Sequence, residues 1–151
     1  MPRKPFLNHY KFFLVILISA AFLSACQATI IPRPTVEVVG ELLAVDGGSY
    51  TNVSPAELDT MLMSKDFTFI NVHTPFEGKI AQTDLFIAYD LINQDQDKLP
   101  TDKNTKIVLY CRSGHMSDNA AKTLIKLGYT NIWNLSGGMV AWENASLSIE
   151  H

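Results

Sequence analysis

The chain has 151 residues, 47% of them hydrophobic and 18% charged, so it can bury one ordinary core but hardly two. Its formal charge is −3. If the three basic residues of the N-terminal segment are removed by cleavage, 9 basic residues stand against 15 acidic ones, a balance of −6. This balance argues against nucleic acid as a partner. We therefore expect a single domain that does not bind nucleic acid.

The N-terminus has the layout of a bacterial lipoprotein signal peptide. Three basic residues precede an apolar run at residues 12–23, which is shorter than the roughly 20 apolar residues of a transmembrane helix. The sequence Leu-Ser-Ala-Cys that follows resembles a lipobox, so residues 1–25 are predicted to be cleaved and Cys26 to carry the lipid. An ordinary secretory signal or a short uncleaved anchor is the alternative. The expected product is an exported, membrane-anchored lipoprotein, and Gln27 favours the outer membrane, facing the periplasm, where the cell has one.

Residues 26–49 are predicted to be the lipidated cysteine and a flexible tether. They contain several prolines and glycines and show little sustained periodicity, with room for an extended piece near residues 35–39. The tether would lift the following domain off the membrane.

Residues 50–146 alternate strands and helices, as is typical of an α/β domain with a mostly parallel sheet. Ser54 and Glu57 form a capping box that opens the first helix, with Pro55 at its first position. Residues 147–151 are assigned to a C-terminal tail. The predicted strands cover residues 51–53, 67–72, 85–88, 106–110 and 131–135. A loose helical turn is predicted within residues 93–104, one helix from Ser117 to Gly128, and a short helix after Gly138.

Cys111 stands where one of the predicted strands ends. A polar loop follows it, and then a helix is predicted to begin. In such a unit several loop amides and the helix N-terminus can point at the sulfur and stabilise a negative charge without a metal. A buried structural thiol is the commoner fate of a free cysteine. However, if Cys26 is lipidated, Cys111 has no disulfide partner in an exported chain, which favours a functional thiol.

Several motifs occur in an order and spacing that resemble a single-domain rhodanese, a sulfurtransferase family, over roughly residues 50–144. The resemblance implies a rhodanese-like α/β fold, with a mostly parallel central sheet flanked by helices. It also implies a persulfide-forming cysteine, which maps onto Cys111, in a loop of backbone amides running from Arg112 to Ser117. The carrying segments are residues 54–58, 69–75, 110–117, 127–129 and 135–142.

Two segments depart from the family pattern. Asn71 and His73 flank Val72 where members usually have Asp-Val-Arg, so an acid and its basic partner are replaced. Residues 78–83 read Gly-Lys-Ile-Ala-Gln-Thr where members usually have Gly-His-Ile-Pro-Gly-Ala. These departures bear on substrate preference and on turnover itself, and they keep open the alternative of a catalytically silent module that binds a partner at the membrane surface.

The first residues of the loop have both functional and ordinary interpretations. Arg112 either attracts an anionic donor or is a solvated surface charge. Ser113 and Ser117 are candidates to donate hydrogen bonds to the sulfur, and the minimum role of Ser117 is to cap the helix. Gly114 is expected to permit the curvature of the backbone.

Three further residues complete the candidate site. His115 is an acid–base group, part of a specificity wall, or a solvent-facing loop histidine. Met116 stands where many family members have Arg or Thr. His73 follows a strand end, and it is a candidate to face the same cleft. No spacing of His, Cys and Asp resembles a metal site.

The expected chemistry is transfer of sulfane sulfur. The thiolate of Cys111 would attack a donor such as thiosulfate, form a persulfide and pass the sulfur to cyanide or a thiol, without a cofactor, as a thiosulfate:cyanide sulfurtransferase does. The sequence does not identify a protein partner. A phosphatase of the Cys-x5-Arg type is disfavoured, because that chemistry needs an arginine where Ser117 stands.

Overall fold

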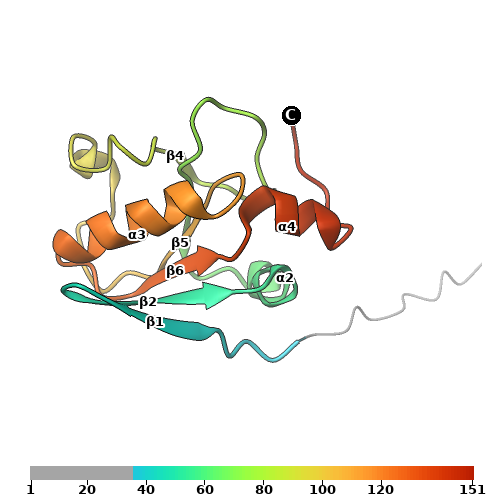
Figure 1. The fold of residues 1–151 in the computed structure, drawn as a ribbon, viewed down its shortest axis with the longest axis horizontal. Coiled ribbons are helices and arrows are strands. Elements are labelled where there is room, and N and C mark those ends of the chain that lie inside the picture. Colours follow the sequence, from blue (N-terminus) through green and yellow to red (C-terminus); the bar gives the residue numbers. More distant parts are fainter. Residues whose placement is uncertain (1–35) are drawn as a thin grey trace, which may run out of the picture. The chain divides into compact units, whose positions relative to one another are not determined.

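The computed structural model describes residues 36–151, which belong to one compact unit (Figure 1). The predicted signal peptide, residues 1–25, and the predicted lipid attachment site, Cys26, lie outside the described residues. Within residues 36–151, no helix combines the length and the apolar character needed to cross a bilayer.

Six strands form one sheet in the order β1-β2-β6-β5-β3-β4. Strands β1 and β2 form an antiparallel hairpin, and every other neighbouring pair is parallel. The predicted α/β class with a mostly parallel sheet is therefore confirmed. The strands are β1 (Glu41–Val45), β2 (Gly48–Val53), β3 (Thr68–Asn71), β4 (Leu85–Phe86), β5 (Ile107–Tyr110) and β6 (Ile132–Leu135); the helices are α2 (Pro55–Met63), α3 (His115–Lys126) and α4 (Gly138–Asn144), with a 3-10 turn η1 (Gln96–Lys98).

The central strand β5 is buried along its whole length and contributes to a core on each face of the sheet. Its side chains alternate between the two faces. Ile107 and Leu109 join the core cluster that holds the buried residues of α3, whereas Val108 and Tyr110 join the cluster that holds those of α2 and α4. Helices therefore cover both faces of β5, and the residue that follows this strand is surrounded by structure.

The predicted tether ends earlier than residue 49. Residues 41–45 form β1, and the hairpin turns through Gly47, whose φ of +89° suits glycine, into β2. Leu43 and Val45 pack against the core, while Leu42 between them is exposed. We missed this strand in the sequence because the glycines that flank it resemble a linker. The domain therefore begins before residue 41.

The predicted C-terminal tail packs against the domain. Leu147 and Ile149 contact the core cluster of α2 and α4. The backbone of Glu150 forms two hydrogen bonds with that of Lys79, of 2.8 and 2.7 Å. The domain boundary predicted at residue 146 thus falls inside the packed body.

Candidate active site

Cys111 lies directly after β5, at the carboxyl end of the parallel strands, and it is only 1% exposed. Its sulfur accepts a hydrogen bond from the amide of Gly114 at 3.1 Å and another from the hydroxyl of Ser117 at 3.5 Å. Several inward amides were expected, but within residues 36–151 the sulfur accepts hydrogen bonds from one amide and one hydroxyl. Both donors favour a charged sulfur over a neutral one.

Ser117 does not cap the helix, and this part of the prediction was wrong. Helix α3 begins two residues earlier, at His115, and Gly114 is its N-cap, with a φ of +99°. Ser117 is fully buried in the first turn, where its Oγ lies 3.0 Å from the carbonyl oxygen of Gly114 as well as 3.5 Å from the sulfur. Because a hydroxyl has one hydrogen, it serves one acceptor at a time, and a negative charge on sulfur would draw it away from the carbonyl.

The start of α4 holds the cysteine loop from the other side. The amides of Met139 and Val140 donate to the carbonyls of Cys111 and Arg112, each at 2.9 Å. Gly138 lies so close to this loop that a Cβ atom on it would come within 2.3 Å of the Cys111 oxygen. Gly137 precedes α4 and Gly138 is its first residue, and two consecutive glycines between a strand and a helix are the available sequence signal of this close packing.

Glu77 links two of the predicted site residues. Its Oε2 atom forms an ion pair with Nη1 of Arg112 and lies 3.5 Å from Nε2 of His73. The His73 side chain is only 8% exposed, and neither ring nitrogen has a hydrogen-bond partner among the described residues. The structure therefore brings His73 next to Arg112 through a carboxylate that sequence reasoning missed. The only signal for Glu77 was an acidic residue shortly after a strand end.

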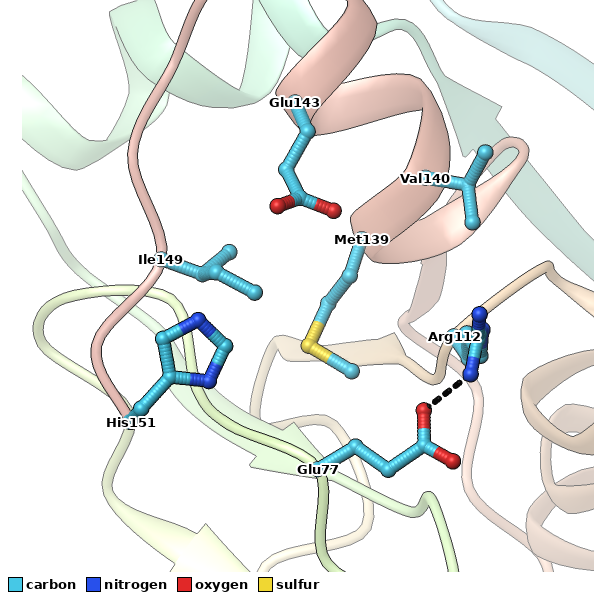
Figure 2. Close-up of a pocket in the computed structure, with 7 residues that line it drawn as sticks. All are labelled: Glu77, Arg112, Met139, Val140, Glu143, Ile149 and His151. Atoms are coloured by element: carbon cyan, nitrogen blue, oxygen red, sulfur yellow. Dashed lines mark hydrogen bonds and ion pairs between the residues drawn. The ribbon is translucent and has the colours of Figure 1, made fainter.

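A pocket of about 240 Å³ opens beside the loop (Figure 2). Arg112 and Glu77 face each other on one side of it, and the carboxylate of Glu143 points toward it from α4. Cys111 is not among the residues that line the pocket, so the pocket adjoins the loop through Arg112. The lining residues are Glu77, Arg112, Met139, Val140, Glu143, Ile149 and His151.

Residues 54–145 match the family model described as Rhodanese-like domain. The chain belongs to the rhodanese-like family. A protein named Sulfurtransferase from Allochromatium vinosum is 34% identical over 89 residues, which make up 57% of this chain and 80% of that protein. The rhodanese-related protein from Thermoplasma volcanium has a solved structure with a TM-score of 0.56 and 27% identity, covering 65% of this chain and 95% of that one.

Other relatives are larger proteins of a different kind. A tRNA uridine(34) hydroxylase from Erwinia tasmaniensis is 30% identical over 112 residues, and the match covers 66% of this chain but only 29% of the hydroxylase. The similarity therefore covers most of this chain and a minor part of that longer protein.

Of the side chains in the cysteine loop of this rhodanese-like domain, only that of Ser117 hydrogen-bonds to the sulfur among the described residues. Ser113 and His115 are exposed, and His115 is the first residue of α3 and not part of a loop as predicted. Met116 is half-buried and packs against the core cluster of α3. The ring of His73 likewise forms no hydrogen bond with Cys111 among the described residues.

The two segments that depart from the rhodanese pattern are tied to each other. Asn71 is buried, its Nδ2 donates to the carbonyl of Gly78 at 3.0 Å, and its Oδ1 accepts from the amide of His73 at 2.9 Å. The hydroxyl of Tyr110 accepts from the amide of Ile80 at 3.0 Å, and burial raises the pKa of this tyrosine. The segment from 71 to 80, which carries Glu77, is therefore fixed by hydrogen bonds between neutral groups.

Proposed function

We propose that this rhodanese-like protein is a sulfurtransferase or persulfide carrier that uses Cys111 as its nucleophile. The observation that carries the proposal is the position of the thiol, at the end of β5 with the Gly114 amide and the Ser117 hydroxyl directed at its sulfur. The family's sulfurtransferase relatives support the same class of reaction.

The reaction takes place in two displacements at sulfur. The Cys111 thiolate attacks the outer sulfur of a donor such as thiosulfate, and the S–S bond of the donor breaks, with its electron pair leaving on sulfite. The persulfide anion that remains on Cys111 then presents its terminal sulfur to cyanide or a thiol, and the cysteine thiolate leaves. No redox cofactor is needed, because each bond that breaks is replaced by one that forms.

The loop serves this chemistry by stabilising negative charge. The Gly114 amide is held by the left-handed N-cap conformation, and the Ser117 hydroxyl can turn from the Gly114 carbonyl to the sulfur as charge develops there. Both donors lie within α3 or at its N-terminus, where the helix dipole also favours an anion.

A catalytically silent binding module is the second candidate. The near-complete burial of Cys111 and the pairing of Arg112 with Glu77 favour it, because a donor would have to displace part of the loop to reach the sulfur. The two candidates differ in whether Cys111 accepts and releases sulfur.

The test is to follow sulfur on Cys111. We expect intact-mass spectrometry after thiosulfate treatment to show one added sulfur in the wild type and none in Cys111→Ser. Cyanide should then release thiocyanate and restore the original mass. A persulfide that forms but does not pass to cyanide would indicate a carrier with a different acceptor. If thiosulfate and other sulfane donors all fail to add sulfur, the enzyme reading is wrong and the binding module remains.

We also propose that the protein is anchored to the membrane through a lipid on Cys26, with its small-molecule donor and acceptor outside the cytoplasm. The support is the lipobox-like sequence that ends at this residue. We expect radiolabelled palmitate to be incorporated into the wild type and not into Cys26→Ser, and the variant to leave the membrane fraction. A cleaved Cys26→Ser product that stays in the membrane would contradict the proposal.

A further inference from the structure

The charge of Arg112 is already balanced by a carboxylate of the same chain. Its Nη1 atom pairs with Oε2 of Glu77, and the same oxygen lies 3.5 Å from Nε2 of the buried His73 ring. The ring follows the end of β3 and is only 8% exposed, so it occupies space that is closed to the carboxylate. Glu77 therefore keeps Arg112 at the rim of the pocket.

The charges around the pocket do not favour an anion. Glu77 and Arg112 cancel each other, and Glu143 adds a second carboxylate from α4 (Figure 2). A dianion such as thiosulfate that approaches the loop through this pocket is repelled by the net negative charge of these side chains. It can bind Arg112 only in competition with Glu77. A donor without net negative charge meets no such opposition.

We propose that Glu77 is a specificity-determining residue, which by holding Arg112 disfavours anionic sulfur donors and favours uncharged or cationic ones. The proposal rests on the sulfurtransferase function proposed above and narrows its substrate class. Among donors that are otherwise equal, an organic persulfide or polysulfide without net negative charge is then preferred. The sequence analysis offered attraction of an anionic donor as one role of Arg112. Because Arg112 is paired with Glu77, its charge is not free for that role.

The expected size of the effect follows from the exposure of the pair. The side chain of Arg112 is 57% exposed and that of Glu77 is 39% exposed, so water and salt screen the interaction. An exposed pair of this kind changes an equilibrium by roughly 1.5- to 5-fold. Glu77 should therefore shift donor preference without switching a donor on or off.

The test compares Glu77→Gln with Glu143→Gln at low salt. Both variants remove one negative charge from the same pocket, but only the first frees Arg112. We expect Glu77→Gln to lower the KM for thiosulfate by roughly 1.5- to 5-fold with kcat little changed, and to leave the kinetics of cysteamine persulfide, a zwitterion without net charge, unaltered. Glu143→Gln should have a clearly smaller effect. Adding Arg112→Ala to Glu77→Gln should abolish the gain.

A second readout does not depend on sulfur transfer. The rate of alkylation of Cys111 by anionic iodoacetate, divided by that by neutral iodoacetamide, reports the charge at the approach to the sulfur. We expect this ratio to rise in Glu77→Gln and to fall back in the double variant with Arg112→Ala. If Glu77→Gln gives the same ratio as Glu143→Gln, or a lower ratio than the wild type, the proposal is wrong. If the ratio rises but no donor adds sulfur to the wild type, the charge arrangement stands and the sulfurtransferase function fails.

Discussion

A single glycine sets how closely α4 can approach the cysteine. Gly138 has a φ of +58°, and a Cβ atom on it would lie 2.3 Å from the oxygen of Cys111 and 2.7 Å from that of Arg112. Both clashing atoms belong to the backbone, so they cannot turn away as a flexible side chain can. Any larger residue here must push the start of α4 away from the loop.

We predict that Gly138→Ala lowers the free energy of unfolding by more than about 2 kcal/mol and strongly reduces sulfur uptake by Cys111. The substitution combines left-handed backbone strain, which costs about 1–2 kcal/mol, with a clash that strains the hydrogen bonds from Met139 and Val140 to the loop. Urea unfolding and persulfide mass spectrometry measure the two effects.

Gly128→Ala is the matched control. Gly128 also has a left-handed φ, of +89°, but nothing lies within 4 Å of the position of its Cβ. It should therefore lose only the backbone term of about 1–2 kcal/mol and keep its sulfur uptake. Equal losses in the two alanine variants would show that the contact of Gly138 with the loop is unimportant.

At the scale of single residues, the sequence predicted the position of Cys111 but not its partners. A cysteine after a buried apolar strand falls at the carboxyl end of the sheet wherever the strand is parallel, so its place follows from local pattern. The pairing of Glu77 with Arg112 depends on how residues 71–80 are folded, and no local pattern contains that information. Ser117 was assigned to the cap because helix ends are uncertain by one or two residues.

At the scale of elements, α2 does more than cover the sheet. Its predicted capping box is present, with the Ser54 hydroxyl accepting from the Glu57 amide at 3.3 Å. The Glu57 carboxylate also accepts hydrogen bonds from the amides of Val39 and Gly40, at 3.1 and 2.9 Å. Glu57, the third residue of α2, therefore fixes the chain that enters β1.

We predict that Glu57→Gln destabilises the domain near neutral pH and that the loss shrinks in acid. Hydrogen bonds from the amides of Ser54 and Gly40 lower the pKa of Glu57 from 4.5 to about 2. Since the pKa of the folded state is the lower one, the stabilisation is fully present above pH 4.5 and is lost as the pH falls through about 2. The free energy of unfolding in urea, measured from pH 7 down to pH 2, should show the two proteins converging; a constant difference would contradict the prediction.

Ser54→Ala tests the contribution of the helix cap separately from that of the Glu57 charge. It removes the hydroxyl that caps α2 and leaves the Glu57 carboxylate ionised, so it should cost about 0.5–2 kcal/mol. Sulfur transfer at saturating donor should be nearly unchanged, because Ser54 lies outside the cysteine loop and the pocket beside it. A folded variant that had lost all activity would show that α2 or the site is misplaced.

The elements themselves were predictable where burial imposes a clear pattern. Strand β5 is buried on both faces and therefore has a continuous apolar run, and it was predicted to within one residue. Strand β1 lies at one edge of the sheet, where only alternate side chains reach the core. Its pattern is correspondingly weak, and its glycine neighbours led us to extend the tether through it.

At the scale of the whole molecule, the last residues close the domain. The backbone of Glu150 pairs with that of Lys79, the indole of Trp142 donates to the carbonyl of Ser148 at 3.0 Å, and Leu147 and Ile149 contact the core. This segment also contributes two residues to the wall of the pocket beside the cysteine loop.

We predict that deletion of residues 147–151 lowers the free energy of unfolding by about 2–4 kcal/mol, because two partly buried apolar side chains and several hydrogen bonds are lost. Urea unfolding measures the change. The control is Glu150→Gln, which removes only an exposed ion pair with Lys79 and should cost less than about 1 kcal/mol. A truncated protein as stable as the wild type would contradict the prediction and show that residues 147–151 do not stabilise the domain.

The contacts between α4 and the cysteine loop have a consequence for the order of folding. The amides that hold the carbonyls of Cys111 and Arg112 belong to Met139 and Val140, which are made 28 residues after the segment that they enclose. A growing chain can form β3, β5 and α3 before these amides exist. The loop thus reaches its final form only after residue 140 has been made, and until then the thiol is open to any oxidant that the nascent chain meets.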